Sequence, residues 1–393
     1  MPHTSNQERV LPLAPLKIAY LEGASEMAHA IDSSLVKMRR ARGARDPEAA
    51  KVRCNIESTY LLETKCSRYG TGEGKAKILD SVRGVDLFIL ADVMNYSITY
   101  KVCGHENHMS PDNHFQDIKR IISAANGRAH RITVVMPFLY ESRQHKRSAR
   151  ESLDCAVALQ ELTNLGVESV ITFDAHDPRV QNAIPIKSFE NVQPTYQFIK
   201  ALLRNVPDIQ MDCKNLMLIS PDEGAMSRAV YFATVVGTEM GMFYKRRDYS
   251  TIVDGRNPIV AHEFLGTDVK GKDVIIIDDM ISSGDSMLDV AKELKKRNAG
   301  RIFVCATFGL FTNGLAAFDK AYADGLIYRV VTTNLVYQTP ELLSREWYIT
   351  ADMSKYIALL IDSLNHDASI SEYLDPTERI HKILERKRNG EKI

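Results

Sequence analysis

The stretch that decides the fold is Val274-Ile-Ile-Ile-Asp-Asp-Met-Ile-Ser-Ser-Gly-Asp-Ser286. Its β-branched apolar run predicts a fully buried strand of a parallel sheet. Two carboxylates, Asp278 and Asp279, follow this run, and a Ser/Gly turn then leads into a helical pattern over 287–297. Ligands of open α/β sheets bind where strands end and helices begin. The sequence therefore predicts a binding site over 278–286.

The side chains of this turn are suited to a phosphorylated sugar. Hydroxyls come from Ser282, Ser283 and Ser286, and the loop amides together with the helix N-terminus favour a phosphate. The two acids suit sugar hydroxyls or Mg²⁺. The stretch resembles the phosphoribosyl-binding loop of the phosphoribosyltransferase fold, in which an apolar run and two acids precede a short Ser/Thr/Gly loop. The alternative is an ordinary strand–turn–helix unit with a capping serine.

The composition is that of a globular protein with room for two domains. A chain of 393 residues can bury two cores of ordinary size. Hydrophobic residues make up 45% and charged residues 25%, as in soluble proteins. Fifty basic and fifty acidic residues cancel, so the totals favour neither a nucleic acid nor a membrane as a partner. The longest apolar runs are too short to span a bilayer.

Cysteine usage and the first residues predict the compartment. None of the six cysteines belongs to a Cys-x-x-Cys pair, a pattern typical of free thiols in a reducing cytoplasm. Residues 1–14 contain polar residues and prolines but no apolar signal-peptide core, so we expect a flexible leader. The sequence therefore predicts a cytoplasmic protein.

Short β-branched runs alternate with helix-period stretches along most of the chain. We expect strands at 16–21, 86–90, 131–136, 167–173, 214–219, 241–244, 273–277, 301–307 and 326–331. We expect helices at 112–126, 148–165, 192–204, 223–237, 285–298, 313–323, 351–364 and 376–389. This alternation predicts the α/β class, with two doubly wound parallel-sheet domains. Their expected bounds are 15–185 and 186–345, followed by a helical tail over 346–393.

Two segments are expected to be loop insertions. Residues 39–55 are rich in Arg, Ala and Asp, whereas residues 100–113 bring Cys103, His105 and His108 close together. The second segment raises the possibility of zinc, but Cys-x-His-x-x-His lacks the fourth ligand of a closed structural site. A polar surface loop is the favoured interpretation.

Four further segments carry groups suited to phosphate chemistry. Asp174-Ala-His176 and Ser220-Pro-Asp-Glu-Gly224 follow predicted strands, and their acids and imidazole can hold a metal. The donors of Arg143–Arg147 suit a polyphosphate. Lys245–Arg247 place three cations before the turn-rich stretch 248–258, and a mobile cationic loop suits a transferring phosphoryl group. Taken alone, each segment is also consistent with a structural turn or a solvated surface.

In this order, the segments resemble the ribose-phosphate pyrophosphokinases, also called PRPP synthetases. The family's Ser-Pro-Asp-x-Gly is intact at Ser220–Gly224, and its Lys-Arg-Arg stands at Lys245–Arg247. Its Arg-Gln-Asp-Arg-Lys is met by Arg143–Arg147, and its Asp-Leu-His is met by Asp174–His176. Its Phe-Ser-Asp-Gly-Glu hairpin resembles Tyr69–Glu73.

This resemblance extends over roughly residues 15–360 and implies both fold and activity. The implied fold is that of the type I phosphoribosyltransferases in both domains, with the active site between them. The implied reaction transfers the pyrophosphoryl group of MgATP to the anomeric hydroxyl of ribose 5-phosphate, giving PRPP and AMP. It also implies Mg²⁺ as cofactor, ATP and ribose 5-phosphate as ligands, and a homo-oligomer of dimers that assemble to a hexamer.

The resemblance assigns a role to each motif. The sugar phosphate would be held by Ser282, Ser283, Gly284, Asp285 and Ser286, and the ribose hydroxyls by Asp278 and Asp279. ATP would be bound by Arg143 and Gln144 and by a neighbouring subunit's turn with Tyr69, Thr71, Gly72 and Glu73. His176 and Asp222 would bind Mg²⁺. Lys245 and Arg247 would act from the catalytic loop.

The sequence also departs from the family. Asp285 replaces a Gly of the phosphate loop, and it would weaken phosphate binding only if its carboxylate pointed inward. Thr71 replaces an Asp of the hairpin, and the insertions and tail are atypical, so regulation and assembly are expected to differ. The alternatives are a phosphoribosyltransferase that consumes PRPP and a non-catalytic regulatory paralog. The presence of Lys245, Arg247 and both proposed metal ligands favours the enzyme.

Overall fold

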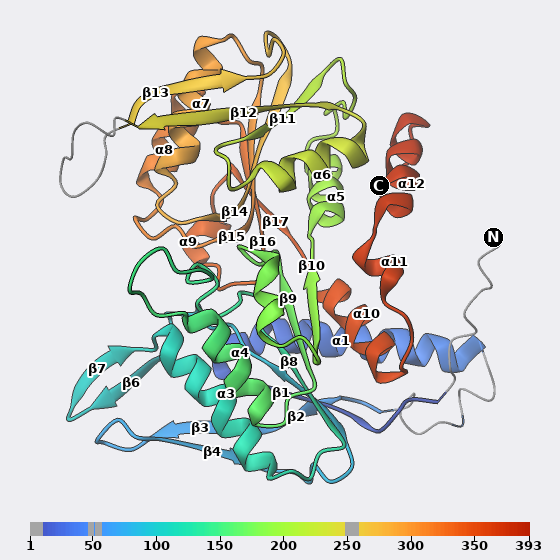
Figure 1. Cartoon of the computed structure of the whole chain (residues 1–393). Coiled ribbons are helices and arrows are strands. Elements are labelled where there is room, and N and C mark those ends of the chain that lie inside the picture. The colour runs from blue at the N-terminus through green and yellow to red at the C-terminus, as the bar shows by residue number, and fades with distance from the viewer. Residues whose placement is uncertain (1–10, 46–50, 52–56, 248–258) are drawn as a thin grey trace. The chain divides into compact units, whose positions relative to one another are not determined.

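The computed structural model describes residues 11–45, 51, 57–247 and 259–393, which form two compact units (Figure 1). Unit 1 contains the described residues up to Gln193 together with Asn334–Tyr337 and Asp352–Asp375. Unit 2 contains Pro194–Thr333, Gln338–Ala351 and Pro376–Ile393, apart from the residues not described. Each unit is built around one largely parallel sheet, so the predicted α/β class is confirmed.

The sheet of unit 1 has six parallel strands in the order β10-β9-β8-β5-β1-β2. The strands are β1 (Leu16–Tyr20), β2 (Leu61–Leu62), β5 (Asp86–Leu90), β8 (Arg131–Val135), β9 (Ser169–Phe173) and β10 (Ser188–Val192). The helices are α1 (Ser25–Arg45), α3 (Pro111–Ala125), α4 (Asp154–Asn164), α10 (Ser354–Asn365) and α11 (Ser371–Leu374). Every residue of β5 and β9 is buried, as expected of central parallel strands.

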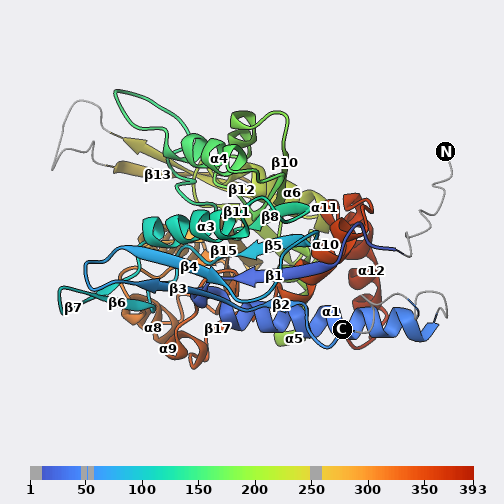
Figure 2. The same ribbon diagram turned by 90° about the horizontal axis from the view of Figure 1, so that it is seen from below.

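Two antiparallel hairpins extend from unit 1 and lie side by side in both ribbon views (Figure 2). One consists of β3 (Thr64–Arg68) and β4 (Gly74–Ile78), and the other of β6 (Thr99–Val102) and β7 (His105–His108). The expectation of an irregular loop over 100–113 is therefore wrong, because β6 and β7 pair and α3 begins at Pro111. No group of three His, Cys, Asp or Glu side chains within the described chain is arranged to hold a metal.

The second expected insertion is also only partly a loop. Residues 39–45 continue α1, whereas residues 46–50 and 52–56 lie outside the described residues. Arg39 is completely buried on α1, and its guanidinium donates to Asp362 at 2.7 Å and to Asn365 at 2.7 Å. From the sequence alone, an arginine-rich stretch is expected to lie in solvent. Here α10 supplies Asp362 and Asn365, which accept hydrogen bonds from the Arg39 guanidinium.

The same contacts revise the expected domain bounds. The tail expected over 346–393 divides, because α10 packs on α1 in unit 1 whereas α12 (Thr377–Arg388) belongs to unit 2. The expected leader, residues 1–14, is fixed at its described end, since Leu13 donates its N–H to the carbonyl of Asn365 at 2.7 Å and Ala14 is buried. Residues 1–10 lie outside the described residues.

The sheet of unit 2 has seven strands in the order β13-β12-β11-β14-β15-β16-β17, all parallel except β13. They are β11 (Leu216–Ser220), β12 (Glu239–Arg247), β13 (Ile259–Leu265), β14 (Asp273–Ile281), β15 (Ile302–Gly309), β16 (Arg329–Thr333) and β17 (Tyr348–Ala351). The helices are α5 (Thr195–Asn205), α6 (Met226–Val236), α7 (Asp285–Lys296), α8 (Ala316–Ala323), α9 (Pro340–Leu343) and α12.

The alternation of side chains along these strands produces two cores. Leu218 and Ile275 pack in the core that includes α5, α6 and α12. Ile219 and Ile276, the next residue of each strand, pack in the core on the other face with α7 and α8. Because both faces are covered, the strands are apolar throughout rather than alternating, which is the pattern that the sequence displayed at 274–277.

Strand β12 is longer than predicted. The expected strand 241–244 extends to Arg247 because β13 pairs with it, Lys245 opposite His262 and Arg247 opposite Ile259. The expected cationic loop over 248–258 lies outside the described residues. No strand was predicted at the position of β10, because Ser188–Val192 is short and partly polar.

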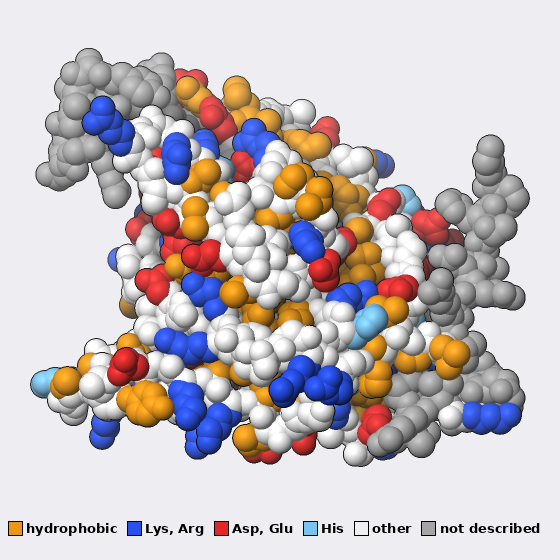
Figure 3. Space-filling view, turned by 60° about the horizontal axis from the view of Figure 1, so that its bottom comes forward, with side chains coloured by type: hydrophobic (Ala, Val, Ile, Leu, Met, Phe, Trp, Pro, Cys, Tyr) orange, Lys and Arg blue, Asp and Glu red, His pale blue; other side chains and the backbone are white. Residues whose placement is uncertain are grey.

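No helix among the described residues is long and apolar enough to cross a membrane. On the face drawn in Figure 3, acidic and basic side chains are interspersed, as their equal numbers in the sequence lead one to expect.

We predict that Asp362→Asn destabilises the protein by about 3 to 5 kcal/mol, because it leaves the buried charge of Arg39 uncompensated. Burial alone would raise the pKa of Asp362, but Arg39 and Arg42 hold it below the usual value. The ionised pair therefore stabilises the fold above about pH 4, and this contribution is lost as the pH falls through the lowered pKa. Urea unfolding followed by circular dichroism measures the effect.

The matched control is Asp289→Asn, which removes an exposed partner of Lys292 on α7. Its effect should stay below about 0.5 kcal/mol. Equal effects of the two substitutions would contradict the role of the buried pair.

Candidate functional site

The turn after β14 is built around Gly284. Its φ is +88°, and a Cβ at this position would lie 2.4 Å from Cε2 of Phe318, so no larger residue fits without a shift. The carbonyl of Gly284 accepts the N–H of Leu288 at 3.0 Å, which begins α7. Asp285 is the first residue of α7 and is exposed.

Three acids lie close together where β11 and β14 end. Asp279 is buried, and its Oδ2 lies 3.7 Å from Nη2 of Arg228, whereas Asp278 accepts the N–H of Asp279 at 2.8 Å. Burial, and then the charges of Asp279 and Asp222, raise the pKa of Asp278 well above its usual value. Such a concentration of negative charge favours a cation or hydroxyl donors as ligands.

Asp222 is held in place by the turn that precedes α6. Its Oδ1 accepts the N–H of Gly224 at 3.0 Å, and Ser220 Oγ donates to the carbonyl of Asp222 at 2.6 Å. Strands β12 and β14 lie on opposite sides of β11. Crevices beside such reversals of strand order are the usual ligand sites of open α/β sheets. The structure brings Asp222 close enough to Asp278 in unit 2 for their charges to interact.

In unit 1, the loops after β8 and β9 bring two imidazoles together. The ring centres of His145 and His176 lie 5.3 Å apart. Strand β9 ends in a tight turn, in which buried Asp174 takes a φ of +40° and Ala175 donates its N–H to Asn191 at 2.9 Å. Because Ala175 is hydrogen-bonded to Asn191 of β10, the turn fixes the backbone position of the next residue, His176.

Asp177 and Arg179 were not singled out from the sequence, and His145 was named only as one of the donors of Arg143–Arg147. His145 Nε2 lies 3.6 Å from Oδ2 of Asp177, and its Nδ1 is buried without a hydrogen-bond partner. The hydrogen bond from Arg179 is the main cause that lowers the pKa of Asp177 to about 2, so this carboxylate is ionised. The feature of the sequence that could have indicated this group is His145, which occupies the position of the Asp in the family's Arg-Gln-Asp-Arg-Lys motif.

The structure places the proposed ATP contacts on two different parts of unit 1. Arg143 is exposed, and Gln144 is anchored by its Nε2, which donates to the carbonyl of Ser152 at 2.7 Å. Tyr69 and Glu73 belong instead to the turn between β3 and β4, where Thr71 Oγ1 donates to Glu73 Oε2 at 2.8 Å. Lys245 and Arg247 have their backbones in β12, and their side chains are not described.

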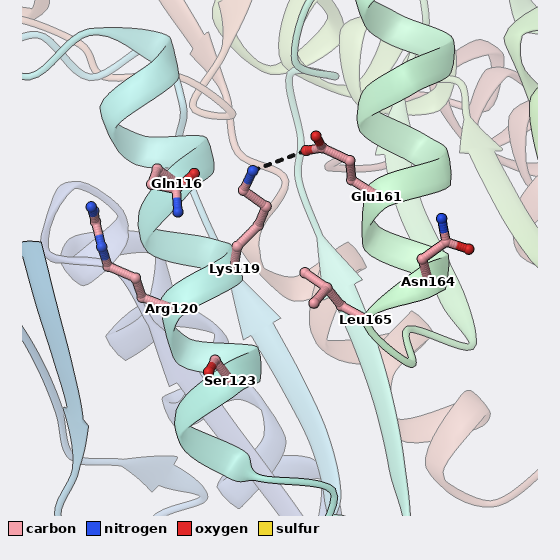
Figure 4. Close-up of a pocket in the computed structure, with 7 residues that line it drawn as sticks. All are labelled: Gln116, Lys119, Arg120, Ser123, Glu161, Asn164 and Leu165. Carbon is pink, nitrogen blue, oxygen red and sulfur yellow. Dashed lines mark hydrogen bonds and ion pairs between the residues drawn. The ribbon is translucent and has the colours of Figure 1, made fainter.

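One groove holds none of the predicted site residues. It lies between α3 and α4, has a volume of about 490 Å³, and is crossed by the ion pair of Lys119 and Glu161 at 2.9 Å (Figure 4). Its remaining lining residues are Gln116, Arg120, Ser123, Asn164 and Leu165. We assign no ligand to this polar groove.

Comparison with known proteins decides the family. The family model described as the N-terminal domain of ribose phosphate pyrophosphokinase matches residues 16–166. A second model, described as the phosphoribosyl synthetase-associated domain, matches residues 255–375. The chain belongs to the ribose-phosphate pyrophosphokinase family. The family predicted from the motifs is thereby confirmed.

Individual pyrophosphokinases match along nearly their whole length. The ribose-phosphate pyrophosphokinase of Pasteurella multocida is 29% identical over 332 residues, which cover 84% of this chain and 96% of the relative. That of Vibrio cholerae is 28% identical over 330 residues, covering 83% and 95%. The crystal structure of phosphoribosylpyrophosphate synthetase from Mycobacterium smegmatis superposes with a TM-score of 0.70 at 18% identity, covering 90% of this chain and 99% of that one. This likeness confirms the fold.

The electrostatics of the three acids in unit 2 can be tested directly. We predict that Asp222→Asn lowers the pKa of Asp278, because one of the negative charges that raise it is removed. The pKa should stay above the usual value, since burial is the larger cause. Carboxyl-carbon NMR titration measures it, with exposed Asp289→Asn as the matched control that leaves Asp278 unchanged. If the pKa of Asp278 were unchanged in Asp222→Asn, the charge of Asp222 would not act on Asp278.

Proposed function

We propose that this chain transfers the pyrophosphoryl group of ATP to the anomeric hydroxyl of ribose 5-phosphate, forming PRPP and AMP. The observation that carries the proposal is the edge of unit 2 where the Gly284 turn and the acids Asp222, Asp278 and Asp279 lie at the ends of adjacent strands. A phosphate-binding turn beside carboxylates for hydroxyls suits a phosphorylated sugar. Membership of the pyrophosphokinase family supports the same substrate.

In the proposal, unit 2 binds the sugar and unit 1 binds ATP. The 5-phosphate is bound by the backbone and hydroxyls of Ser282–Ser286, and Asp278 and Asp279 accept from the ribose hydroxyls. Asp279 already lies 3.7 Å from Nη2 of Arg228. Arg143 and Gln144 bind ATP from the loop after β8. Tyr69, Thr71, Gly72 and Glu73 contact ATP from the β3–β4 turn of a neighbouring subunit, so the proposal includes a homo-oligomer.

The donor sets fit Mg²⁺ bound together with the nucleotide. Mg²⁺ takes one or two protein groups and completes its shell with water and substrate phosphates. This agrees with the lack of any three-residue cluster for a metal among the described side chains. His176 is the proposed Mg²⁺ ligand of unit 1, and Asp222 is the proposed Mg²⁺ ligand of unit 2. When bound, Mg²⁺ neutralises charge that develops on the phosphates.

The chain's own residues then act mainly by positioning. The anomeric oxygen attacks the β-phosphorus of ATP, the bond between this phosphorus and the oxygen bridging to the α-phosphorus breaks, and AMP leaves. Lys245 and Arg247 neutralise the developing charge on the transferred group. Such transfers depend on alignment and charge compensation more than on covalent chemistry by the protein.

Two alternatives use parts of the same site. A phosphoribosyltransferase would consume PRPP and needs a base, so it would form no AMP from ATP and ribose 5-phosphate. A regulatory paralog would bind the ligands without turnover. The retention of Lys245, Arg247, His176 and Asp222 argues against the paralog.

The deciding experiment measures AMP formed from ribose 5-phosphate, MgATP and a panel of other nucleotides. Formation of AMP and PRPP in equal amounts is the expected result. The proposal fails if the folded protein binds both substrates and releases no AMP.

Lys245→Ala should reduce kcat by about a hundredfold or more and change the KM for ribose 5-phosphate little. The reason is that a cation facing the transferred group acts mainly when charge develops in the transition state. Steady-state kinetics with both substrates separates the two parameters. Near-normal kcat with a raised KM would contradict the catalytic role. Lys292→Ala, on the exposed face of α7, is the matched control.

Asp285→Gly should leave the affinity for ribose 5-phosphate within a few-fold of the original chain. Its exposed carboxylate favours the N-terminus of α7, so its loss should lower stability by about 0.5 kcal/mol. Calorimetric titration and thermal unfolding measure the two effects. A tenfold gain in affinity, equal to about 1.4 kcal/mol, would instead place the carboxylate against the phosphate.

A further inference from the structure

The β6–β7 hairpin, in the segment that was expected to be an insertion, lies against the hairpin that carries Tyr69–Glu73 (Figures 1 and 2). Its turn donates a hydrogen bond from the N–H of Cys103 to the carbonyl of Gly70 at 2.7 Å. Next to this bond, a Cβ on Gly72 would lie only 3.1 Å from Cγ2 of Val102. The inserted hairpin therefore touches the β3–β4 turn with both backbone and side chain.

The β3–β4 hairpin requires such support. Two strands without a further layer are marginally stable in water. Beside its turn the hairpin is held by α3, where Asp117 accepts from Arg68 at 2.8 Å and from Arg120 at 2.7 Å. The Arg120 guanidinium lies directly over Gly74, since a Cβ there would be 2.3 Å from its Cζ. These contacts hold the two residues that flank the turn, Arg68 and Gly74.

The inserted hairpin is itself well fixed. Cys103 and Gly104 form its two-residue turn with φ of +49° and +83°, as in type I′ turns, whose twist matches the strands. Thr99 Oγ1 donates to Glu106 Oε1 at 2.9 Å across the strands. At its base, the ring of Tyr100 lies 5.5 Å from the guanidinium of Arg68.

A cavity of about 150 Å³ lies behind the two hairpins, between β3, β6 and α3. Its lining includes Cys66, Arg68, Tyr100 and His114. Because this space is not filled by side chains, the strands of the two hairpins are not packed along their whole length. The turn Tyr69–Glu73 has its own hydrogen bonds, from Tyr69 to Glu73 and from Gly72 to Tyr69, and the bond from Cys103 and the contact of Val102 add support from the β6–β7 hairpin.

We propose that the β6–β7 hairpin positions the nucleotide-binding turn, with Val102 and the backbone N–H of Cys103 as positioning groups. The inference rests on the proposed function, since it takes Tyr69–Glu73 as a contact of ATP. A turn already held in its bound conformation loses less conformational freedom when ATP binds. In this chain the inserted hairpin therefore sets the affinity for the nucleotide and leaves that for the sugar phosphate unchanged.

Two variants remove the support, and a third keeps it. The first replaces residues 99–108 by Gly-Gly, which is possible because Met109 donates its N–H to Ile98 at 2.8 Å and so holds the ends together. The second is Cys103→Pro, which lacks the N–H and cannot take a positive φ. The matched third is Cys103→Asn, which keeps the N–H and tolerates positive φ.

The probe is a non-hydrolysable ATP analogue, titrated calorimetrically into the full-length protein with Mg²⁺. The first two variants should bind it roughly tenfold more weakly and raise the KM for ATP to a similar degree. Their KM for ribose 5-phosphate should stay within about twofold, and Cys103→Asn should match the original chain in both values. Thermal unfolding verifies that each variant is folded.

Several results would overturn the proposal. One is a folded chain without residues 99–108 that binds the analogue as tightly as the original chain. A second contradicting result is equal affinity of Cys103→Pro and Cys103→Asn for the analogue. The backbone N–H of residue 103 would then have no positioning role. A parallel loss of affinity for ribose 5-phosphate would indicate a general structural effect. Failure of the original chain to form AMP would instead overturn the proposed function, because the calorimetric comparison does not depend on turnover.

Discussion

Parallel pairing of the strands is the constraint on which the arrangement of this protein depends. Every neighbouring pair in the sheet of unit 1, and every pair but β12 with β13 in unit 2, is parallel. Parallel strands need crossover connections, so helices cover both faces and all strands end at the same edge. Groups that are distant in sequence, such as Asp222 after β11 and Asp278 within β14, therefore meet. The loops that lead from these parallel strands into the helices therefore share this edge, where the candidate site residues of unit 2 lie.

Whether a buried acid stabilises the fold or belongs to the candidate site depends on the charged groups beside it. Asp362 is buried, but Arg39 and Arg42 supply opposite charge, so its pKa is lowered and the pair serves the fold. Burial, and then the charges of two neighbouring carboxylates, raise the pKa of Asp278. Burial of an acid without a compensating cation is unfavourable unless a ligand provides the missing charge or hydrogen bonds. The lowered pKa of Asp362 is therefore typical of a stabilising ion pair, whereas the raised pKa of Asp278 is typical of a binding site.

Two segments that were expected to be loops are attached to unit 1 by a few specific polar contacts. The β6–β7 hairpin bonds to the turn between β3 and β4 through the N–H of Cys103. In the C-terminal part of α1, the buried Arg39 donates to Asp362 and Asn365 of α10. The fold as a whole matches that of the Mycobacterium smegmatis structure with a TM-score of 0.70 at 18% identity.

The sequence by itself determined the α/β class, the glycine turn between β14 and α7 and the family, because apolar runs, glycine and adjacent acids act through local geometry. It did not determine that 39–45 is helical, that 100–108 forms a hairpin, or that the tail divides between the units, since Arg39, Cys103 and Asp362 depend on partners far along the chain. The approach of His145 to His176 was likewise invisible, because 30 intervening positions separate the two loops. Only the tertiary structure decided these features: a polar side chain or a free backbone N–H can be satisfied by solvent or by a distant group, and the local sequence does not distinguish the two.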